Sequence, residues 1–153
     1  MAAKSLVHRW VVAYQDWRYG SIDPGAKLGV RGEQAAARFL RRKGLTIIAH
    51  SESDRAGELD LIATNRNRNS IIFVEVKTLA STKPGHPADR VDENKQARIT
   101  RAGLRYLHRN KLLGCTCRFD VVAVWWPQDS DEPTRIEHYQ GAFEATGVEG
   151  FYS

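Results

Sequence analysis

The hydrophobic and polar positions of the chain change period several times, and each change marks a predicted element. Apolar residues recur every three or four positions over residues 29–43 and 91–109, which predicts two helices. The first helix ends at a basic run followed by Gly44, a typical stop signal. Shorter apolar runs bounded by polar turns predict strands. The predicted strands cover residues 45–50, 58–63, 71–78, 118–126 and 135–139.

The order of these elements predicts an α/β fold with a mixed central sheet flanked by helices. The turn between residues 58–63 and 71–78 is short enough for an antiparallel hairpin. Strand 71–78, helix 91–109 and strand 118–126 form a crossover unit, so these two strands should run parallel. Residues 79–90, between strand and helix, have the composition of a polar loop.

The chain divides into three segments. Residues 1–28 form an N-terminal extension, residues 29–143 form the main domain, and residues 144–153 form a C-terminal tail. Aromatic and aliphatic residues at helical spacing predict a helix in part of the extension. That helix is a candidate docking segment or dimer contact, which leaves a homodimer open.

The composition indicates one globular unit in a reducing compartment. The chain has 153 residues, of which 42% are hydrophobic, enough for one core. No apolar run of about 18 residues, the length of a membrane-spanning helix, is present. Cys115 and Cys117 are too few for a disulfide framework. We therefore expect a cytoplasmic protein that has no membrane partner.

The chain is basic, with a formal net charge of +5 and a pI of about 9.4. This charge favours an anionic partner such as nucleic acid, although a basic protein without such a partner has the same composition. Arg98, Arg101 and Arg105 recur on one side of the second predicted helix. Such a row can follow a phosphate backbone, and it can equally be a solvated helix face.

Two predicted strands carry acidic residues within apolar runs. Strand alternation places Glu75 and Lys77 on one face, about 6.6 Å apart along the strand. If residues 58–63 pair with this strand, Asp60 lies close to Glu75. Two neighbouring carboxylates repel each other unless a cation lies between them, and oxygen ligands suit Mg²⁺. An ordinary ion pair between Glu75 and Lys77 is the alternative interpretation.

Each predicted helix adds one charged residue to this hypothesis. Glu33 is the charged residue on an otherwise small, apolar stripe, so it should point at the sheet. Lys95 lies within the apolar stripe of the second helix and could reach the same cluster or a bound phosphate. The alternatives are a surface glutamate and a lysine whose amine extends to water.

These residues occur in an order that resembles a known superfamily. Glu33, the run Gly57-Glu58-Leu59-Asp60-Leu61-Ile62, and Phe73-Val74-Glu75-Val76-Lys77 resemble the motifs of PD-(D/E)xK nucleases. The span from residue 29 to about 143 is similar to the YraN family of restriction-endonuclease-like proteins. Further matching segments are Arg31-Gly32-Glu33, Val91-Asp92-x-x-Lys95-Gln96 and Arg118-Phe119-Asp120-Val121-Val122. His50-Ser51 stands where the family often carries a segment with asparagine.

The resemblance implies a restriction-endonuclease-like core with a nuclease site. It implies that Asp60 and Glu75 bind Mg²⁺ or Mn²⁺, that Glu33 assists them, and that Lys77 is the catalytic lysine. It also implies that Lys95 and Gln96 face the site. The expected activity is a metal-dependent endonuclease that hydrolyses phosphodiester bonds in DNA, with branched and damaged DNA as candidate substrates. The alternative is a non-catalytic nucleic-acid-binding or interaction module on the same fold.

Overall fold

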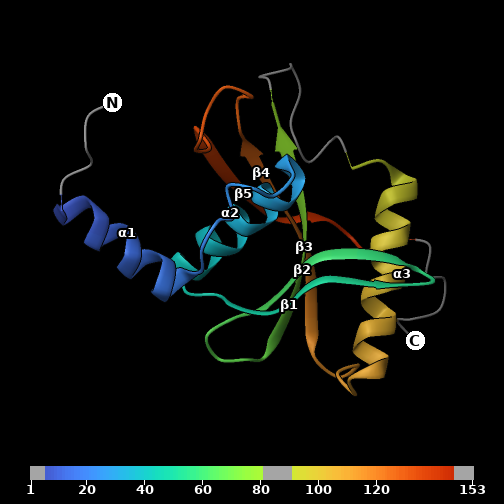
Figure 1. Cartoon of the computed structure of the whole chain (residues 1–153). Helices are drawn as coiled ribbons and strands as arrows, with labels where there is room; N and C mark the ends of the chain where they lie inside the picture. Colours follow the sequence, from blue (N-terminus) through green and yellow to red (C-terminus); the bar gives the residue numbers. More distant parts are fainter. Residues whose placement is uncertain (1–5, 81–90, 147–153) are drawn as a thin grey trace.

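The computed structural model describes residues 6–80 and 91–146, which form an α/β fold (Figure 1). Its helices are α1 (Leu6–Tyr19), α2 (Leu28–Arg42) and α3 (Glu93–Arg109). Its strands are β1 (Thr46–Asp54), β2 (Gly57–Thr64), β3 (Ser70–Leu79), β4 (Thr116–Trp125) and β5 (Arg135–Phe143). The predicted fold class, a mixed sheet flanked by helices, is confirmed.

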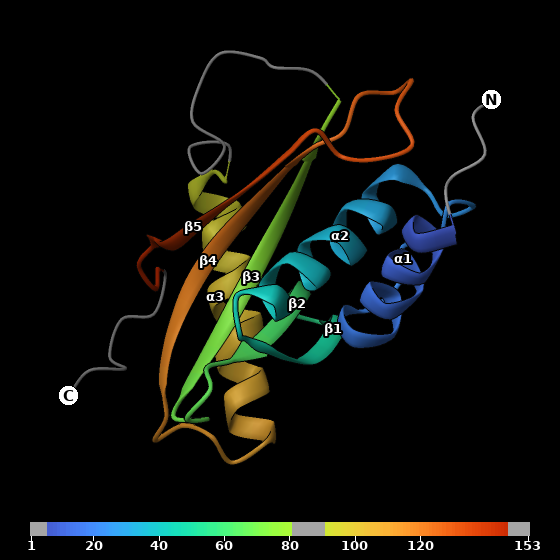
Figure 2. The same ribbon diagram turned by 90° about the vertical axis from the view of Figure 1, so that its left-hand side faces the viewer.

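The five strands form one sheet in the order β1-β2-β3-β4-β5. The β2–β3 hairpin is antiparallel, and β3 and β4 run parallel, as predicted. The remaining pairs, β1–β2 and β4–β5, are antiparallel. Figure 2 shows α2 in front of the sheet and α3 behind it, while α1 lies beside α2 away from the sheet. The sheet is therefore covered by one helix on each face.

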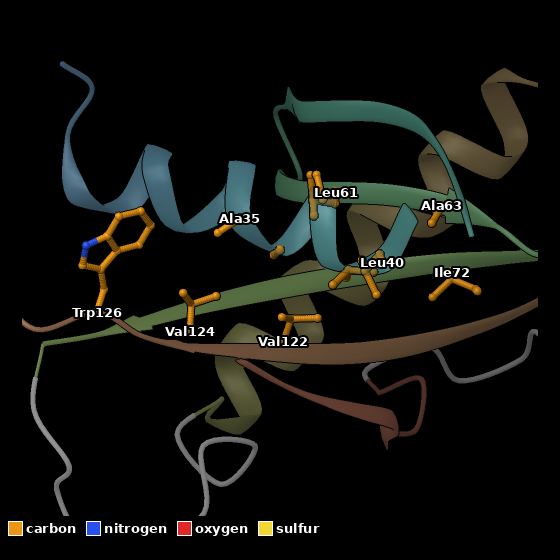
Figure 3. Close-up of a cluster of buried hydrophobic side chains, with 11 residues drawn as sticks. Ala35, Leu40, Leu61, Ala63, Ile72, Val122, Val124 and Trp126 are labelled. Carbon is orange, nitrogen blue, oxygen red and sulfur yellow. The ribbon is translucent and has the colours of Figure 1, made fainter. Parts of the chain in front are cut away.

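Each face of the sheet has its own core. On the α2 side, Ala36 and Leu40 pack against Leu61, Ile72 and other buried residues of β2, β3 and β4 (Figure 3). The helix lies so close to β3 that a Cβ on Gly32 would stand 1.8 Å from the Thr78 hydroxyl oxygen. Glycine is thus required at this contact.

On the α3 side, the core is built around aromatic rings. Phe73 stacks on Phe119 with ring centroids 5.4 Å apart and meets Tyr106 edge to face at 6.1 Å. The Asp92 side chain accepts a hydrogen bond from the Lys95 N–H at 2.8 Å and so caps the start of α3. This cap explains why the helix begins at Glu93 rather than at residue 91.

Two strands are longer than the sequence indicates. The predicted strand 45–50 continues to Asp54, and the predicted strand 135–139 continues to Phe143. Residues 51–54 are polar and resemble a turn, yet they pair with β2 at the edge of the sheet, where water reaches one side. β1 also shifts register between Ile47 and Ala49.

The helix predicted in the extension is present as α1, and it exposes large apolar side chains. Trp10 is 71% exposed and Trp17 is 80% exposed. No helix among the described residues is long and apolar enough to cross a membrane. Most of the predicted polar loop, residues 81–90, and most of the tail, residues 147–153, lie outside the part that the structure describes.

Candidate catalytic site

The candidate site lies where β2 and β3 stop pairing. Their ladder ends at Leu61 and Val74, so Asp60 and Glu75 are the next positions along the two strands. The Val76 N–H donates to Asp60 Oδ2 at 2.7 Å, and the Asp60 carboxylate thus receives an N–H of the neighbouring strand. Glu75 is 4% exposed. The two acids that alternation predicted to be neighbours lie together in the structure.

The surroundings of Asp60 disfavour the ionised form of its carboxylate. Burial, and next the charge of Glu75, raise the pKa of Asp60 to about 7, against the Val76 N–H hydrogen bond, which lowers it. The charge of Glu33 and a hydrogen bond with Glu75 raise this pKa further. Near neutral pH this raised pKa favours the protonated Asp60 side chain unless a cation compensates the nearby charges.

Glu75 contacts two lysines from different elements. Lys77, on the same face of β3, places Nζ 3.3 Å from Glu75 Oε1, and Lys95 of α3 places Nζ 3.5 Å from the same oxygen. The ion pair between Glu75 and Lys77 that alternation left open is thus present. The Lys77 side chain is 27% exposed, so its amine is accessible to a ligand beside the acids.

Glu33 lies at the border of the buried stripe of α2. That stripe consists of Gly32, Ala35, Ala36, Ala37 and Leu40. Val30, an apolar residue three positions before Glu33, is 43% exposed and lies outside this stripe. Glu33 faces the edge strand β1, where Ser51 Oγ donates to its Oε2 at 3.3 Å.

The charge of Glu33 belongs to the same acidic neighbourhood. Burial raises the pKa of Glu33, the hydrogen bond from Ser51 lowers it, and the charges of Glu58 and Glu75 raise it. Ser51 is the partner that sequence reasoning missed. The departure of His50-Ser51 from the family pattern was the signal that could have indicated it.

The donor set of Asp60 and Glu75 fits a hard divalent cation. Both side chains offer carboxylate oxygens, the charged form of Asp60 needs a compensating positive charge, and Mg²⁺ typically takes one or two carboxylates plus waters and phosphate. Within residues 6–80 and 91–146, no group of three or more His, Cys, Asp and Glu side chains is arranged to hold a metal.

The other predicted contacts on α3 have different surroundings. Gln96 Nε2 donates to the Val91 carbonyl at 2.9 Å and so braces the start of its own helix. Arg105 Nε donates to Asp54 Oδ2 at 2.6 Å, which joins α3 to the end of β1. Arg98 and Arg101 are exposed, and neither has an ion pair among the described residues. Their predicted role in nucleic-acid binding stays a prediction, as does that of Arg105.

A second buried acid lies on β4. Arg118 Nε donates to Asp120 Oδ1 at 2.9 Å, across one face of the strand. His138 Nε2 lies 2.7 Å from Asp120 Oδ2, and the Gly141 N–H donates to Oδ1 at 2.9 Å. Lys43 Nζ, which can only donate, lies 3.4 Å from His138 Nδ1, so the ring proton is on Nε2. This cluster joins β4 to β5.

Together, the fold and the site define an α/β protein that carries an acid pair and a lysine on two adjacent central strands. The family model described as "Uncharacterised protein family UPF0102" matches residues 32–124, a span that includes Glu33, Asp60, Glu75 and Lys77. The chain belongs to this family, which is the YraN family that its motifs resemble.

Similar proteins are found in several bacteria. UPF0102 protein RB9115 of Rhodopirellula baltica is 72% identical over 91% of this chain and 83% of its own length. A UPF0102 protein of Trichlorobacter lovleyi is 43% identical over 76% of this chain and 90% of its own. The structure of Pyrococcus furiosus SfsA in complex with Ca²⁺ covers 74% of this chain and 62% of its own at 13% identity, with a TM-score of 0.32 that is too low to carry a conclusion.

Proposed function

We propose that this protein is a metal-dependent endonuclease that hydrolyses phosphodiester bonds in DNA. The observation that carries the proposal is the pair Asp60 and Glu75 at the end of the β2–β3 ladder, with Lys77 Nζ 3.3 Å from Glu75. Branched and damaged DNA are the candidate substrates. The free cysteines, Cys115 and Cys117, favour the cytoplasm as its location.

In this proposal Asp60 and Glu75 hold a Mg²⁺ or Mn²⁺ ion. When bound, such an ion supplies polarisation of the phosphoryl oxygen and a water of lowered pKa. Lys77 lies on the same strand face as Glu75 and can orient or deprotonate the attacking water, or balance charge on the phosphate. Glu33, fixed by its hydrogen bond from Ser51, adds a further acceptor near the acids.

The surface supports an anionic substrate. Arg98 and Arg101 are exposed on α3, the helix that also brings Lys95 to Glu75. The net charge of +5 acts in the same direction. Arg105 would join this contact only by leaving or sharing its partner Asp54.

The test is a cleavage assay on duplex, single-stranded and four-way-junction DNA, with Mg²⁺, Mn²⁺ or EDTA. We expect cleavage that needs metal and falls by at least about 10²-fold in Asp60→Asn and in Glu75→Gln, because each removes a charged ligand. Asp129→Asn, which removes one exposed acid from a loop, is the charge-matched control. Equal behaviour of the wild type and both site variants on every substrate would sink the catalytic proposal.

A non-catalytic module is the second candidate, and two observations favour it. Glu75 already has two lysine partners, and α1 exposes Trp10 and Trp17 as contacts for a partner or a second copy. Here, salt-sensitive DNA binding should survive Asp60→Asn and weaken in the double variant Arg98→Gln/Arg101→Gln. A homodimer through α1 would lose mass by light scattering when Trp10 and Trp17 are replaced by glutamine.

A further inference from the structure

A surface pocket of about 380 Å³ lies between α2, β1 and the segment after α1. Its polar lining consists of Ser21, Glu33, Gln34, Arg41, His50 and Ser51. Glu33 is the member that belongs to the acidic neighbourhood of Asp60. Ser51 holds Glu33 through its hydrogen bond, and the proposed chemistry uses none of the other four. The pocket thus begins at the candidate catalytic site and extends to a part of the surface that is rich in hydrogen-bond donors.

Arg41 is the charged group of this pocket that has no acidic partner. Within the described residues, no Asp or Glu lies within ion-pair distance of its guanidinium. Burial lowers the pKa of Arg41, which shows that its charge is partly removed from water. A partly buried cation without a carboxylate is costly, and an anion from outside the chain would offset that cost.

The guanidinium of Arg41 is held in place by backbone and by a ring. Nη1 donates to the Tyr19 carbonyl at 3.1 Å, and Nη2 lies 3.4 Å from His50 Nε2. A Cβ on Gly20 would stand 2.8 Å from Nη1, and the φ of 92° at this glycine lets the chain pass so close. A guanidinium has about five N–H donors, so most remain available in this fixed orientation.

The neighbours of Arg41 supply further donors. Arginine can only donate, so His50 Nε2 accepts and the ring proton is on Nδ1. Burial and the charge of Arg41 lower the pKa of His50, which keeps the ring neutral at pH 7. Gln34 Oε1 accepts from the Asp23 N–H at 2.8 Å, which leaves the Gln34 amide nitrogen as a donor.

The backbone of β1 is irregular where it forms the pocket wall. Ser51 has a φ of 45°, a conformation that serine rarely adopts, and its hydroxyl donates to Glu33. The register shift between Ile47 and Ala49 lies just before His50. Strain and bulges of this kind concentrate at functional sites and re-aim side chains.

We propose that this pocket is a phosphate subsite that binds a backbone phosphodiester of the nucleic acid, next to the phosphate that is cut. The inference rests on the proposed function, since Glu33 links the pocket to Asp60 and Glu75. Arg41 would be the main contact, because a planar guanidinium matches phosphate oxygens in a bidentate way. His50 and Gln34 would donate to the remaining oxygens. The contrasting residue is Arg38, which joins α1 to α2 through Asp16 and does not line the pocket.

The test measures binding of a labelled oligonucleotide in EDTA at several salt concentrations, so that no cleavage occurs. We expect Arg41→Gln to lower the slope of log K against log salt by about 0.7 for single strands or 0.9 for duplex, the value for one phosphate contact. Affinity should fall roughly tenfold, as for a lost charge-assisted hydrogen bond. Arg38→Gln is the matched control and should keep the wild-type slope. Equal slopes for wild type and Arg41→Gln would overturn the subsite.

A second measurement locates the contact. A series of oligonucleotides carries one neutral methylphosphonate, each at a different position of the strand. The wild type should bind one member of the series more weakly than the others. Arg41→Gln should bind that member with the same affinity as the others. His50→Gln repeats the scan if Arg41→Gln fails to fold by circular dichroism. Inorganic phosphate is the competitor in the same binding measurement. If it displaces the oligonucleotide when both are at equal concentration, a free phosphate is the ligand, and the inference is overturned.

The two proposals fail in different ways. A wild type that binds no nucleic acid contradicts the proposed function and, with it, the subsite. A wild type that binds and cleaves, while Arg41→Gln keeps the same salt slope and the same methylphosphonate profile, contradicts the subsite alone.

Discussion

Asp60 and Asp120 are acids in the middle of the same sheet, but their surroundings differ. Burial acts to raise the pKa of Asp120, yet hydrogen bonds from His138, Arg118 and the Gly141 N–H outweigh it and hold this pKa below its usual value. Within the described residues, Asp60 accepts one backbone hydrogen bond, from the Val76 N–H, and has a carboxylate neighbour; its pKa rises to about 7. A buried acid whose charge is compensated by cations and donors is typical of a structural clamp, whereas one with a strongly raised pKa is typical of a functional site.

The largest expected effect on folding stability comes from breaking the cluster of Asp120, Arg118 and His138. Asp120→Asn removes the charge that holds Arg118 and His138 between β4 and β5, so we expect the free energy of unfolding to fall by about 3 kcal/mol. Urea denaturation followed by circular dichroism measures this loss. Lys43→Gln, which removes the exposed contacts of Nζ to His138 and to the Phe39 ring, is the control and should change little.

The sign of the pH dependence should also separate the two acids. The lowered pKa of Asp120 contributes stability that is present above its unfolded pKa of 3.8 and is lost as pH falls through the folded value. The deficit of Asp120→Asn should therefore shrink in acid. If the loss of folding stability in Asp120→Asn is the same from neutral pH to strong acid, the ionised Asp120 is not what joins β4 to β5.

Asp60→Asn should act in the opposite direction and stabilise the protein. The raised pKa of Asp60 favours the folded state at low pH, and this stability is lost as pH rises from 3.8 through about 7. Asparagine carries no such penalty, so the variant should gain roughly 2 kcal/mol at pH 8 and about a third of that at pH 5. Thermal or urea unfolding at both pH values measures the gain, and a variant less stable than wild type at pH 8 would remove the contrast with Asp120.

Binding of Mg²⁺ should offset the same cost of the charged Asp60 carboxylate in the folded protein. Mg²⁺ at about ten times its dissociation constant should raise the free energy of unfolding of the wild type by about 1.4 kcal/mol. Asp60→Asn lacks the charged ligand and should respond much less. Differential scanning fluorimetry over a Mg²⁺ series, with Asp129→Asn as the charge-matched control, makes this comparison. An equal shift in all three proteins would indicate a general salt effect instead of a site.

The proximity of Asp60 and Glu75 could be predicted from the sequence because strands have a fixed side-chain period. Strand side chains alternate, and a short hairpin leaves few registers, so the two acids and Lys77 could be brought together without coordinates. The same alternation puts Arg118 and Asp120, two positions apart on β4, on one face, where they pair. Helix spacing likewise directed Lys95 toward the sheet, where it contacts Glu75.

Contacts that depend on long-range register could not be predicted. His138 meets Asp120 only because β4 and β5 pair with a shift between Phe119 and Val121, which no local pattern encodes. The pairing of Ser51 with Glu33 was missed for a related reason, since a polar edge strand has the composition of a turn. Arg41 was assigned to the end of a helix, and its position in a pocket depends on the path of the chain after α1.

The smallest expected effect concerns Asp54, an acid near the surface that has its own ion-pair partner. Asp54 at the end of β1 pairs with Arg105, whose side chain is 52% exposed, so Arg105→Gln should cost roughly 0.5 kcal/mol of folding stability. The loss should vanish at high salt, because water and ions screen an exposed pair. Arg98→Gln, on the same helix but without an ion pair in the described chain, is the control. A loss from Arg105→Gln as large as that from Asp120→Asn, measured by urea denaturation at low and high salt, would show that burial does not separate these acids. In that case burial would not explain the high pKa of Asp60, and the charge of Glu75 would be its main cause.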